Sequence, residues 1–252
     1  MAARTRGRVE PTRPFSPRRT GTALWRNLRA IALPVALFLL IRTFLMEAYR
    51  IPSGSMIPAM LIGDWLFVNK LVYGPHLPFT DMQLPGYAEP QRGEIAVFRS
   101  PPQLDQPHDP TPTLVKRIVG MPGDTLYMRG GVLYVNGIPQ RQGEGAAPGH
   151  DSPSELFTWQ EAVVIRGTRF GDPPEQFTHD EWGPLVVTPG HYFMMGDNRY
   201  NSKDSRYWGL VPRRNIRGRP MFVYYSYNAD DSDRPLPFIT DIRWSRIGHW
   251  IR

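Results

Sequence analysis

The chain pairs a potential nucleophile with a potential base that lies far downstream. Ser53 and Ser55 alternate across Gly54 in a proline-bounded turn, and Lys116 lies within an apolar run. A serine hydroxyl becomes a nucleophile when a neighbouring base takes its proton, and a neutral lysine amine can serve as that base. Because the serines follow closely on the only long apolar run of the chain, the pair predicts cleavage of a bond at a membrane surface.

The lysine must be unusual for this chemistry to work. A free lysine has a pKa of about 10.4, and bringing it near neutrality requires a shift of about three units, or roughly 4 kcal/mol. Burial against Leu114 and Val115 would supply such a shift. The alternative is an ordinary turn whose serines cap backbone amides, with Lys116 facing solvent on alternate strand positions. On the residues alone, the solvated lysine is slightly favoured.

Other catalytic patterns are missing from the sequence. It contains no G-x-S-x-G, S-x-x-K or H-E-x-x-H pattern, and no cysteine. The histidines are scattered without an i,i+4 pair: His76, His108, His150, His179, His191 and His249. We therefore predict no metal site and no cofactor. The sequence does not exclude a Ser-His-Asp triad, but no pattern in it identifies the three residues.

The positive charge is confined to the N-terminal tail. Residues 1–29 hold eight arginines and one acid, whereas the rest of the chain has 22 basic and 22 acidic residues. A nucleic-acid-binding protein would carry this charge on a folded face, so we expect no nucleic-acid partner. An arginine-rich tail beside an apolar segment instead indicates a cytoplasmic flank of a membrane span.

The apolar segment covers residues 30–46 and contains Pro34 and Arg42. As a helix it would be roughly 25 Å long, enough to cross a bilayer if its flanks reach the headgroups. The alternative is a cleavable secretory signal, but residues 45–49 lack a clear small-x-small cleavage site. We favour an uncleaved anchor. Trp65, which follows it, is expected either at the lipid interface or in the core.

The remainder of the chain favours β-strands. Aromatic and branched residues between turn signals predict strands at 64–73, 94–99, 114–119, 125–128, 132–135, 185–187, 192–195 and 221–227. We expect a mainly β fold: one N-terminal transmembrane helix, then a mostly antiparallel β-sheet catalytic domain with an inserted β-rich subdomain. The predicted parts are a basic cytoplasmic tail (1–27, disordered over 1–22), an anchor (28–47), a catalytic core (48–124 and 185–252) and an inserted peripheral subdomain (125–184).

Four sequence blocks after the anchor are similar to those of one enzyme family. They are 51–64 with its P-S-G-S-M run, 92–94, 116–124 and 195–209, the last containing M-G-D-N-R and N-S-K-D-S-R-Y-W-G. In this order the chain resembles bacterial type I signal peptidases (leader peptidases), membrane-bound serine proteases that use a Ser–Lys dyad. The resemblance covers nearly all of the chain after the tail.

The resemblance implies a role for individual residues. Ser55 would be the nucleophile, Lys116 the general base, and Ser53 the side-chain donor of the oxyanion hole. Ser202 would orient the lysine amine, with Asp204 and Arg206 as a supporting ion pair. The apolar residues that would line the substrate pockets are Ile51, Met56, Leu114 and Val115. One departure is Tyr200, where many family members have an acid.

The family also implies substrate, partners and location. The expected substrates are signal peptides of exported preproteins, cut after a small-x-small motif. The expected partners are the lipid bilayer and the secretion machinery. The protein would be single-pass in the inner (cytoplasmic) membrane, with its N-terminus cytoplasmic and its catalytic domain on the periplasmic side.

Three other functions remain to be distinguished. A self-cleaving repressor of the LexA type shares Ser–Lys chemistry but needs a DNA-binding helix pair, where this chain has an apolar span. A catalytically inactive, membrane-tethered β-domain would bind export partners without reacting at Ser55. A specialised pilin-processing or conjugation peptidase of the same family would share the whole site.

Overall fold

The computed structural model describes residues 18–78, 80, 82–103, 105–140 and 155–252. Most of the predicted disordered tail and the first part of the polar segment after residue 140 lie outside these ranges. The chain forms two compact units, Met1–Ile41 and Arg42–Arg252, and each is described by itself.

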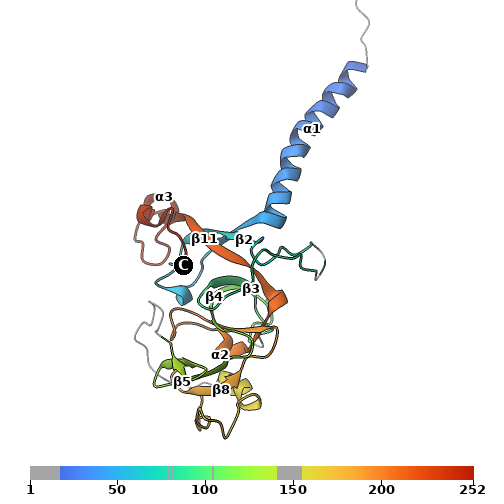
Figure 1. Cartoon of the computed structure of the whole chain (residues 1–252). Helices are drawn as coiled ribbons and strands as arrows, with labels where there is room; N and C mark the ends of the chain where they lie inside the picture. Colours follow the sequence, from blue (N-terminus) through green and yellow to red (C-terminus); the bar gives the residue numbers. More distant parts are fainter. Residues whose placement is uncertain (1–17, 79, 81, 104, 141–154) are drawn as a thin grey trace, which may run out of the picture. The chain divides into compact units, whose positions relative to one another are not determined.

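The described part of the first unit is dominated by one long helix. Helix α1 runs from Arg18 to Leu40 and contains Pro34 (Figure 1). A π-helical turn, η1 (Ile41–Leu45), continues the chain into the second unit. Residues Leu28–Leu45 are long and apolar enough to cross a membrane, and none of that stretch is buried within the protein. An exposed apolar helix of this length is what a bilayer-spanning segment requires.

A seven-stranded sheet organises the second unit. Its strand order is β1-β2-β11-β3-β4-β9-β10, and each neighbouring pair is antiparallel. The bounds in that order are Met46–Arg50, Asp64–Asn69, Ile216–Ser226, Ile95–Arg99, Thr113–Gly120, His191–Met195 and Val211–Pro212. Most predicted strands are present within a few residues of their predicted ends. The mainly β, antiparallel fold is therefore confirmed.

Strand β1 was not predicted. Its sequence, M-E-A-Y-R, shows no apolar alternation, and it follows directly on the apolar helix. Pairing with β2 along its whole length holds it in the sheet, from Met46 opposite Asn69 to Arg50 opposite Trp65. Tertiary pairing, rather than side-chain pattern, makes this segment a strand. Trp65 is half-buried and packs edge-on against Tyr224.

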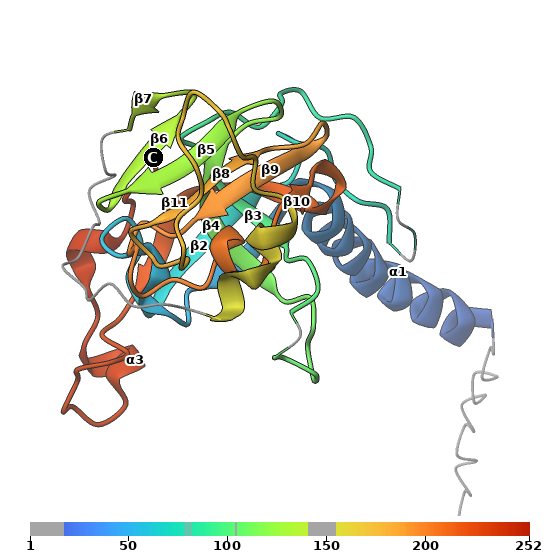
Figure 2. The same ribbon diagram turned by 90° about the horizontal axis from the view of Figure 1, so that it is seen from below.

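A second, four-stranded sheet has the order β7-β6-β5-β8 (Figure 2). Its strands in that order are Ile138–Pro139, Val132–Val135, Thr125–Arg129 and Trp182–Val186. Gly130 and Gly131 turn β5 into β6 with positive φ angles of 54° and 73°, which glycine adopts without strain. The predicted hairpin is therefore present.

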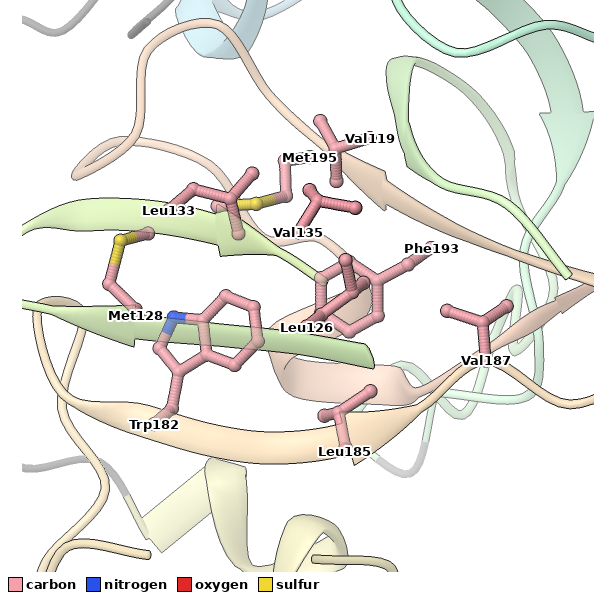
Figure 3. Packing of buried hydrophobic residues seen from close by; sticks show 10 residues of the cluster. All are labelled: Val119, Leu126, Met128, Leu133, Val135, Trp182, Leu185, Val187, Phe193 and Met195. Carbon is pink, nitrogen blue, oxygen red and sulfur yellow. The ribbon is translucent and has the colours of Figure 1, made fainter. Parts of the chain in front are cut away.

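The two sheets share a hydrophobic core (Figure 3). Trp182 of β8 stacks on Phe193 of β9, with ring centroids 5.3 Å apart. Val119 of β4 and Met195 of β9 also pack among the residues of the second sheet. The division into a catalytic core and an inserted subdomain stays a prediction. Residues from the predicted insertion (125–184) pack on β4, which precedes them, and on β9, which follows them.

Short helices fill the connections. The α-helical turns are α2 (Ser205–Trp208) and α3 (Pro237–Thr240). The 3-10 turns are η2 (Gly54–Met56), η3 (Glu155–Ala162), η4 (Arg213–Asn215) and η5 (Trp244–Arg246). Two of them, η2 and α2, belong to the segments that carry the predicted site residues.

Candidate active site

The predicted nucleophile lies on a tight turn beside the sheet. Turn η2 holds Ser55 between Gly54 and Met56. Met56 is buried in a cluster with residues of β2 and β3, so it ties the turn to the sheet. The backbone N–H of Ile57 donates to the Gly54 carbonyl at 3.1 Å and closes the turn. Ser55 itself stays half-buried, within reach of a substrate.

Lys116 reaches this serine from strand β4. It pairs with Ala96 of β3 and is only 4 % exposed. Its Nζ lies 2.5 Å from the Oγ of Ser55 and donates a hydrogen bond to it. The alternative of a lysine facing solvent is therefore wrong. The alternation of side chains along a strand favoured a lysine that faces solvent. The sequence does not reveal that other segments cover both faces of β4.

Burial makes this lysine a weaker base than usual. It lowers the pKa of Lys116 from 10.5 to about 8, against the opposing charge of Asp204, while Arg206 lowers the pKa further. A pKa near 8 leaves about one tenth of the amine neutral at pH 7. The neutral nitrogen has a lone pair that can accept the Ser55 proton across the same short distance.

A loop after β9 completes the site. β9 pairs with β4, with Met195 opposite Arg117, so the loop begins next to the lysine strand. Its first residue, Gly196, has no room for a side chain. A Cβ there would lie 2.2 Å from the Ser202 Oγ and 2.5 Å from the Ser55 carbonyl oxygen. Only glycine permits this approach of the loop to the nucleophile turn.

Asn198 in the same loop holds the nucleophile turn at two points. Its side-chain Nδ2 donates to the Gly54 carbonyl at 3.2 Å. Its backbone N–H donates to the Ser55 carbonyl at 3.1 Å. The peptide groups on both sides of Ser55 are thus fixed from a segment more than a hundred residues away.

Asp204 and Arg206 form a completely buried ion pair. The Asp204 carboxylate accepts hydrogen bonds from the Arg206 Nε at 2.8 Å and Nη2 at 2.9 Å, and from the Gly196 N–H at 3.0 Å. Burial alone would raise the pKa of Asp204, but the charge and hydrogen bonds of Arg206 hold it below its ordinary value. The pair is therefore ionised and ties both ends of the loop together.

Part of the polar segment after residue 140 packs on this pair. The indole Nε1 of Trp159, in η3, donates to the Arg206 carbonyl at 2.7 Å. Gln160 is buried beside it and donates to the same carbonyl at 3.4 Å. The described part of this segment is therefore in contact with the candidate site, which the sequence did not reveal.

Ser202 lies in the site but makes no hydrogen bond there. Its hydroxyl is buried and has no partner among the residues that the structure describes. Within the described chain it forms no hydrogen bond with the Lys116 amine. Its Oγ lies beside Gly196, close to the nucleophile turn. Its predicted role in orienting the amine stays a proposal.

Ser53 precedes the nucleophile in extended conformation and is exposed. Within the described chain its hydroxyl does not cap the turn, and the backbone N–H of Ser55 donates to no backbone carbonyl. Both donors are available to an external oxygen, as an oxyanion hole requires.

The predicted pocket residues do not all converge. Ile51 and Met56 are buried in one cluster, and Val115 packs against it. Leu114 packs against a different cluster, with Phe98 and Met194. The structure thus brings three of the four together, because neighbouring residues of a strand point to opposite faces.

Asp197 and Asn198 lie near the dyad, and the sequence analysis assigned them no role although they belong to a recognised sequence block. Arg117 binds Asp197 through two nearly parallel hydrogen bonds, of 2.7 and 2.6 Å. Asp197 and Asn198 both belong to the M-G-D-N-R run, so the 195–209 block contains these residues as well as the predicted supports Ser202, Asp204 and Arg206. The Tyr200 hydroxyl donates to the Asp180 carboxylate at 2.6 Å.

Comparisons with known proteins identify the family of the chain. Residues 24–225 match the family model described as signal peptidase, peptidase S26. The chain is 38 % identical to a signal peptidase I of Pseudomonas aeruginosa, over 83 % of this chain and 73 % of the relative. It is 32 % identical to a signal peptidase I of Leptolyngbya laminosa, over 85 % and 86 %. A crystal structure of a signal peptidase I from Enterococcus faecalis has 28 % identity and a TM-score of 0.32, over 52 % of this chain and 96 % of that one.

These relatives and the apolar helix together indicate a membrane-anchored enzyme. The family match covers most of the chain and includes every residue of the candidate site. The chain belongs to the signal peptidase family S26, and it is a serine peptidase whose substrates are preproteins with signal peptides.

Proposed function

We propose that the protein is a membrane-bound endopeptidase that cleaves signal peptides with Ser55 as nucleophile and Lys116 as general base. One observation carries the proposal: a buried lysine amine lies 2.5 Å from a serine hydroxyl on an accessible turn. A structural lysine would not need to be buried against a hydroxyl with its pKa lowered toward neutrality.

The reaction follows from the positions of these two groups. Neutral Lys116 takes the proton of the Ser55 hydroxyl as the Oγ attacks the scissile carbonyl carbon. The resulting oxyanion accepts hydrogen bonds from the Ser55 N–H and the Ser53 hydroxyl. The carbon–nitrogen bond then breaks, and the Lys116 proton passes to the leaving amine. Lys116 next deprotonates a water molecule, which hydrolyses the acyl-enzyme ester.

The small-x-small specificity would come from shallow pockets. Ile51 and Met56 are packed into the core behind the nucleophile turn, and Val115 packs against them. Such packing would leave only a shallow recess for a substrate side chain beside the dyad. Alanine or glycine would fit, whereas a larger side chain would have to displace buried residues. Leu114, on the other face, would act at a separate pocket.

The location follows from the charge of the chain. Eight arginines precede or begin the apolar helix, and positive flanks stay on the cytoplasmic side. We therefore place the N-terminus in the cytoplasm and the peptidase unit on the periplasmic face of the inner membrane. There it would receive preproteins from the secretion machinery.

The test replaces Ser55 and Lys116 separately by alanine and measures precursor processing in membranes. Both variants should be inactive; normal processing by either would refute the dyad. Ser53→Ala should lose about 10²–10³ in kcat, because one of two oxyanion donors is removed. Ser232→Ala, far from the site in sequence, is the control.

A second experiment distinguishes an enzyme from an inactive binding domain. A serine-reactive acylating inhibitor should label Ser55 in the wild type and leave Ser55→Ala unlabelled. Stoichiometric label elsewhere, or none at all, would favour the binding domain.

A further inference from the structure

A basic cavity lies apart from the dyad residues. It has a volume of about 370 Å³ and is lined by His76, Arg99, Ser100, Pro102, Thr111, Arg214, Asn215 and Arg217. Three of these residues are arginines and none is acidic. The cavity is built from the end of β3, the turn η4 and the start of β11, together with the loop that carries His76.

Two of its three arginines have no carboxylate partner in the part of the chain that the structure describes. Within the described part of the chain, neither Arg99 nor Arg214 takes part in an ion pair, in contrast to Arg213, which binds Glu89. The Arg99 Nε donates to the Thr111 hydroxyl at 2.8 Å, which holds this guanidinium at the cavity wall. Guanidinium groups that converge without carboxylates favour an anion.

His76 provides a second indication. Its Nε2 contacts the Arg214 carbonyl at 2.8 Å, so this nitrogen carries a proton and donates it. Its Nδ1 is buried without a hydrogen-bond partner among the described residues. Burial lowers the pKa of His76, and the charges of Arg217 and Lys70 lower it further. A bound anion would offset those charges and give the Nδ1 a partner once protonated.

The cavity is close to the first segment after the apolar helix. The N–H of Lys70 donates to the Leu45 carbonyl, the last residue of that helix, at 2.9 Å. His76 follows Lys70 by six positions, which limits the distance between their Cα atoms to about 20 Å. Burial raises the pKa of Tyr49 in β1, and the charge of Arg217 opposes the rise, so Arg217 is near β1 as well.

We propose that Arg99, Arg214, Arg217 and His76 form a binding site for a phosphate group, supplied by the headgroup of an anionic phospholipid. Arginine guanidiniums bind phosphate through paired, charge-assisted hydrogen bonds. The lipid source rests on the proposed membrane anchoring, which would place Leu45 at the headgroups. The phosphate chemistry rests on the cavity alone.

The test uses the full-length chain in neutral detergent micelles. Three ligands are titrated by calorimetry: inorganic phosphate, short-chain phosphatidylglycerol and short-chain phosphatidylcholine. The variant R214Q/R217Q is compared with the wild type. The control R166Q/R169Q removes the same charge from two exposed arginines outside the cavity.

Phosphatidylglycerol should bind saturably and more tightly than phosphatidylcholine. R214Q/R217Q should weaken it by about tenfold or more, because charge-assisted hydrogen bonds are lost, and the control should not. The ring resonances of His76 should shift in the wild type on binding. No saturable binding, or equal binding by both variants, would overturn the site. Binding of inorganic phosphate through these arginines without phosphatidylglycerol binding would overturn the lipid source.

Activity separates this proposal from the proposed function. R214Q/R217Q should still hydrolyse a soluble peptide substrate, which also verifies that it folds. Ser55→Ala should bind phosphatidylglycerol normally while hydrolysing nothing. Failure of one result therefore leaves the other intact.

Discussion

The side-chain amide of Asn198 donates a hydrogen bond to the carbonyl of Gly54, the residue just before Ser55, at 3.2 Å. The backbone N–H of Asn198 binds the next carbonyl, that of Ser55, at 3.1 Å. The nucleophile turn has only three residues, and besides its own closing hydrogen bond and buried Met56 it is held by these two bonds. Its orientation toward the lysine is therefore set by the loop after β9.

Replacing Asn198 by alanine should slow acylation more than it weakens substrate binding. The side-chain bond is lost and the turn gains freedom, so we expect kcat to fall by about tenfold and KM to change little. Single-turnover labelling by an acylating inhibitor measures this step. Lys203→Ala, which removes a more exposed ion pair in the same loop, is the control. An unchanged acylation rate in Asn198→Ala would contradict the positioning role.

Replacing Gly196 by alanine should displace the nucleophile turn. The new methyl group would lie 2.5 Å from the Ser55 carbonyl oxygen and 2.2 Å from the Ser202 hydroxyl, so one of them must move. We expect processing to fall by about a hundredfold, as for other small misplacements of reacting groups. In Gly167→Ala the added carbon meets nothing within 4 Å, although φ is +65°. That variant should lose only about 1 kcal/mol of stability and keep its activity.

The pH dependence of the enzyme should report the lysine. Burial lowers the pKa of Lys116 to about 8, and only the neutral amine accepts a proton. The value of kcat/KM should therefore rise with pH and level off above an apparent pKa of about 8. Peptide hydrolysis between pH 6 and pH 10 measures it. A rising limb near 6.5 would point to a histidine base instead.

Lys116→Met should be inactive yet more stable than the wild type at neutral pH. The lowered pKa means that the unfolded chain binds this proton more tightly than the folded chain. The cost of burying the charge is therefore full below about pH 8 and disappears as pH rises toward the unfolded value of about 10.4. Removing it should add up to roughly 3 kcal/mol to the free energy of unfolding. Denaturant unfolding at pH 7 and pH 10 should show the advantage at pH 7 only.

Asp204→Asn should lower both the stability of the protein and the apparent pKa of its activity. Loss of the buried partner of Arg206 should cost about 3–5 kcal/mol. Asp204 raises the pKa of Lys116, so its removal should lower that pKa below 8 and move the rising limb of kcat/KM to lower pH. Asp105→Asn, which breaks the exposed pair with Lys203, should leave both quantities unchanged. If the rise of kcat/KM with pH stays at the same pH in Asp204→Asn, the ion pair does not influence the pKa of Lys116.

Much of the fold was accessible from the sequence because its signals are local. Gly130-Gly131 between two branched segments predicts the β5–β6 hairpin, and both glycines have the positive φ angles that such a turn requires. Strand β1 was missed since nothing in M-E-A-Y-R favours a strand, and only its partner β2 makes it one. The contact of Trp159 with the Arg206 carbonyl was missed because it joins two segments that are distant in sequence.

The site was predicted unevenly. Family resemblance nominated Ser55 and Lys116, whereas strand alternation alone favoured a solvated lysine. The burial of Lys116 depends on chain segments distant in sequence, and periodicity carries no information about them. Gly196 and Asn198 lie in a recognised motif. They act by contacting Gly54 and Ser55, and these contacts are visible only in the three-dimensional structure.

The dependence of the Ser55 turn on the loop at 196–204 has a consequence for the protein's own biosynthesis. The residues that aim the hydroxyl are made some 140 residues after it. A nascent chain that ends before this loop would lack them. Peptidase activity would consequently begin only once this loop has been synthesised and has folded against the turn.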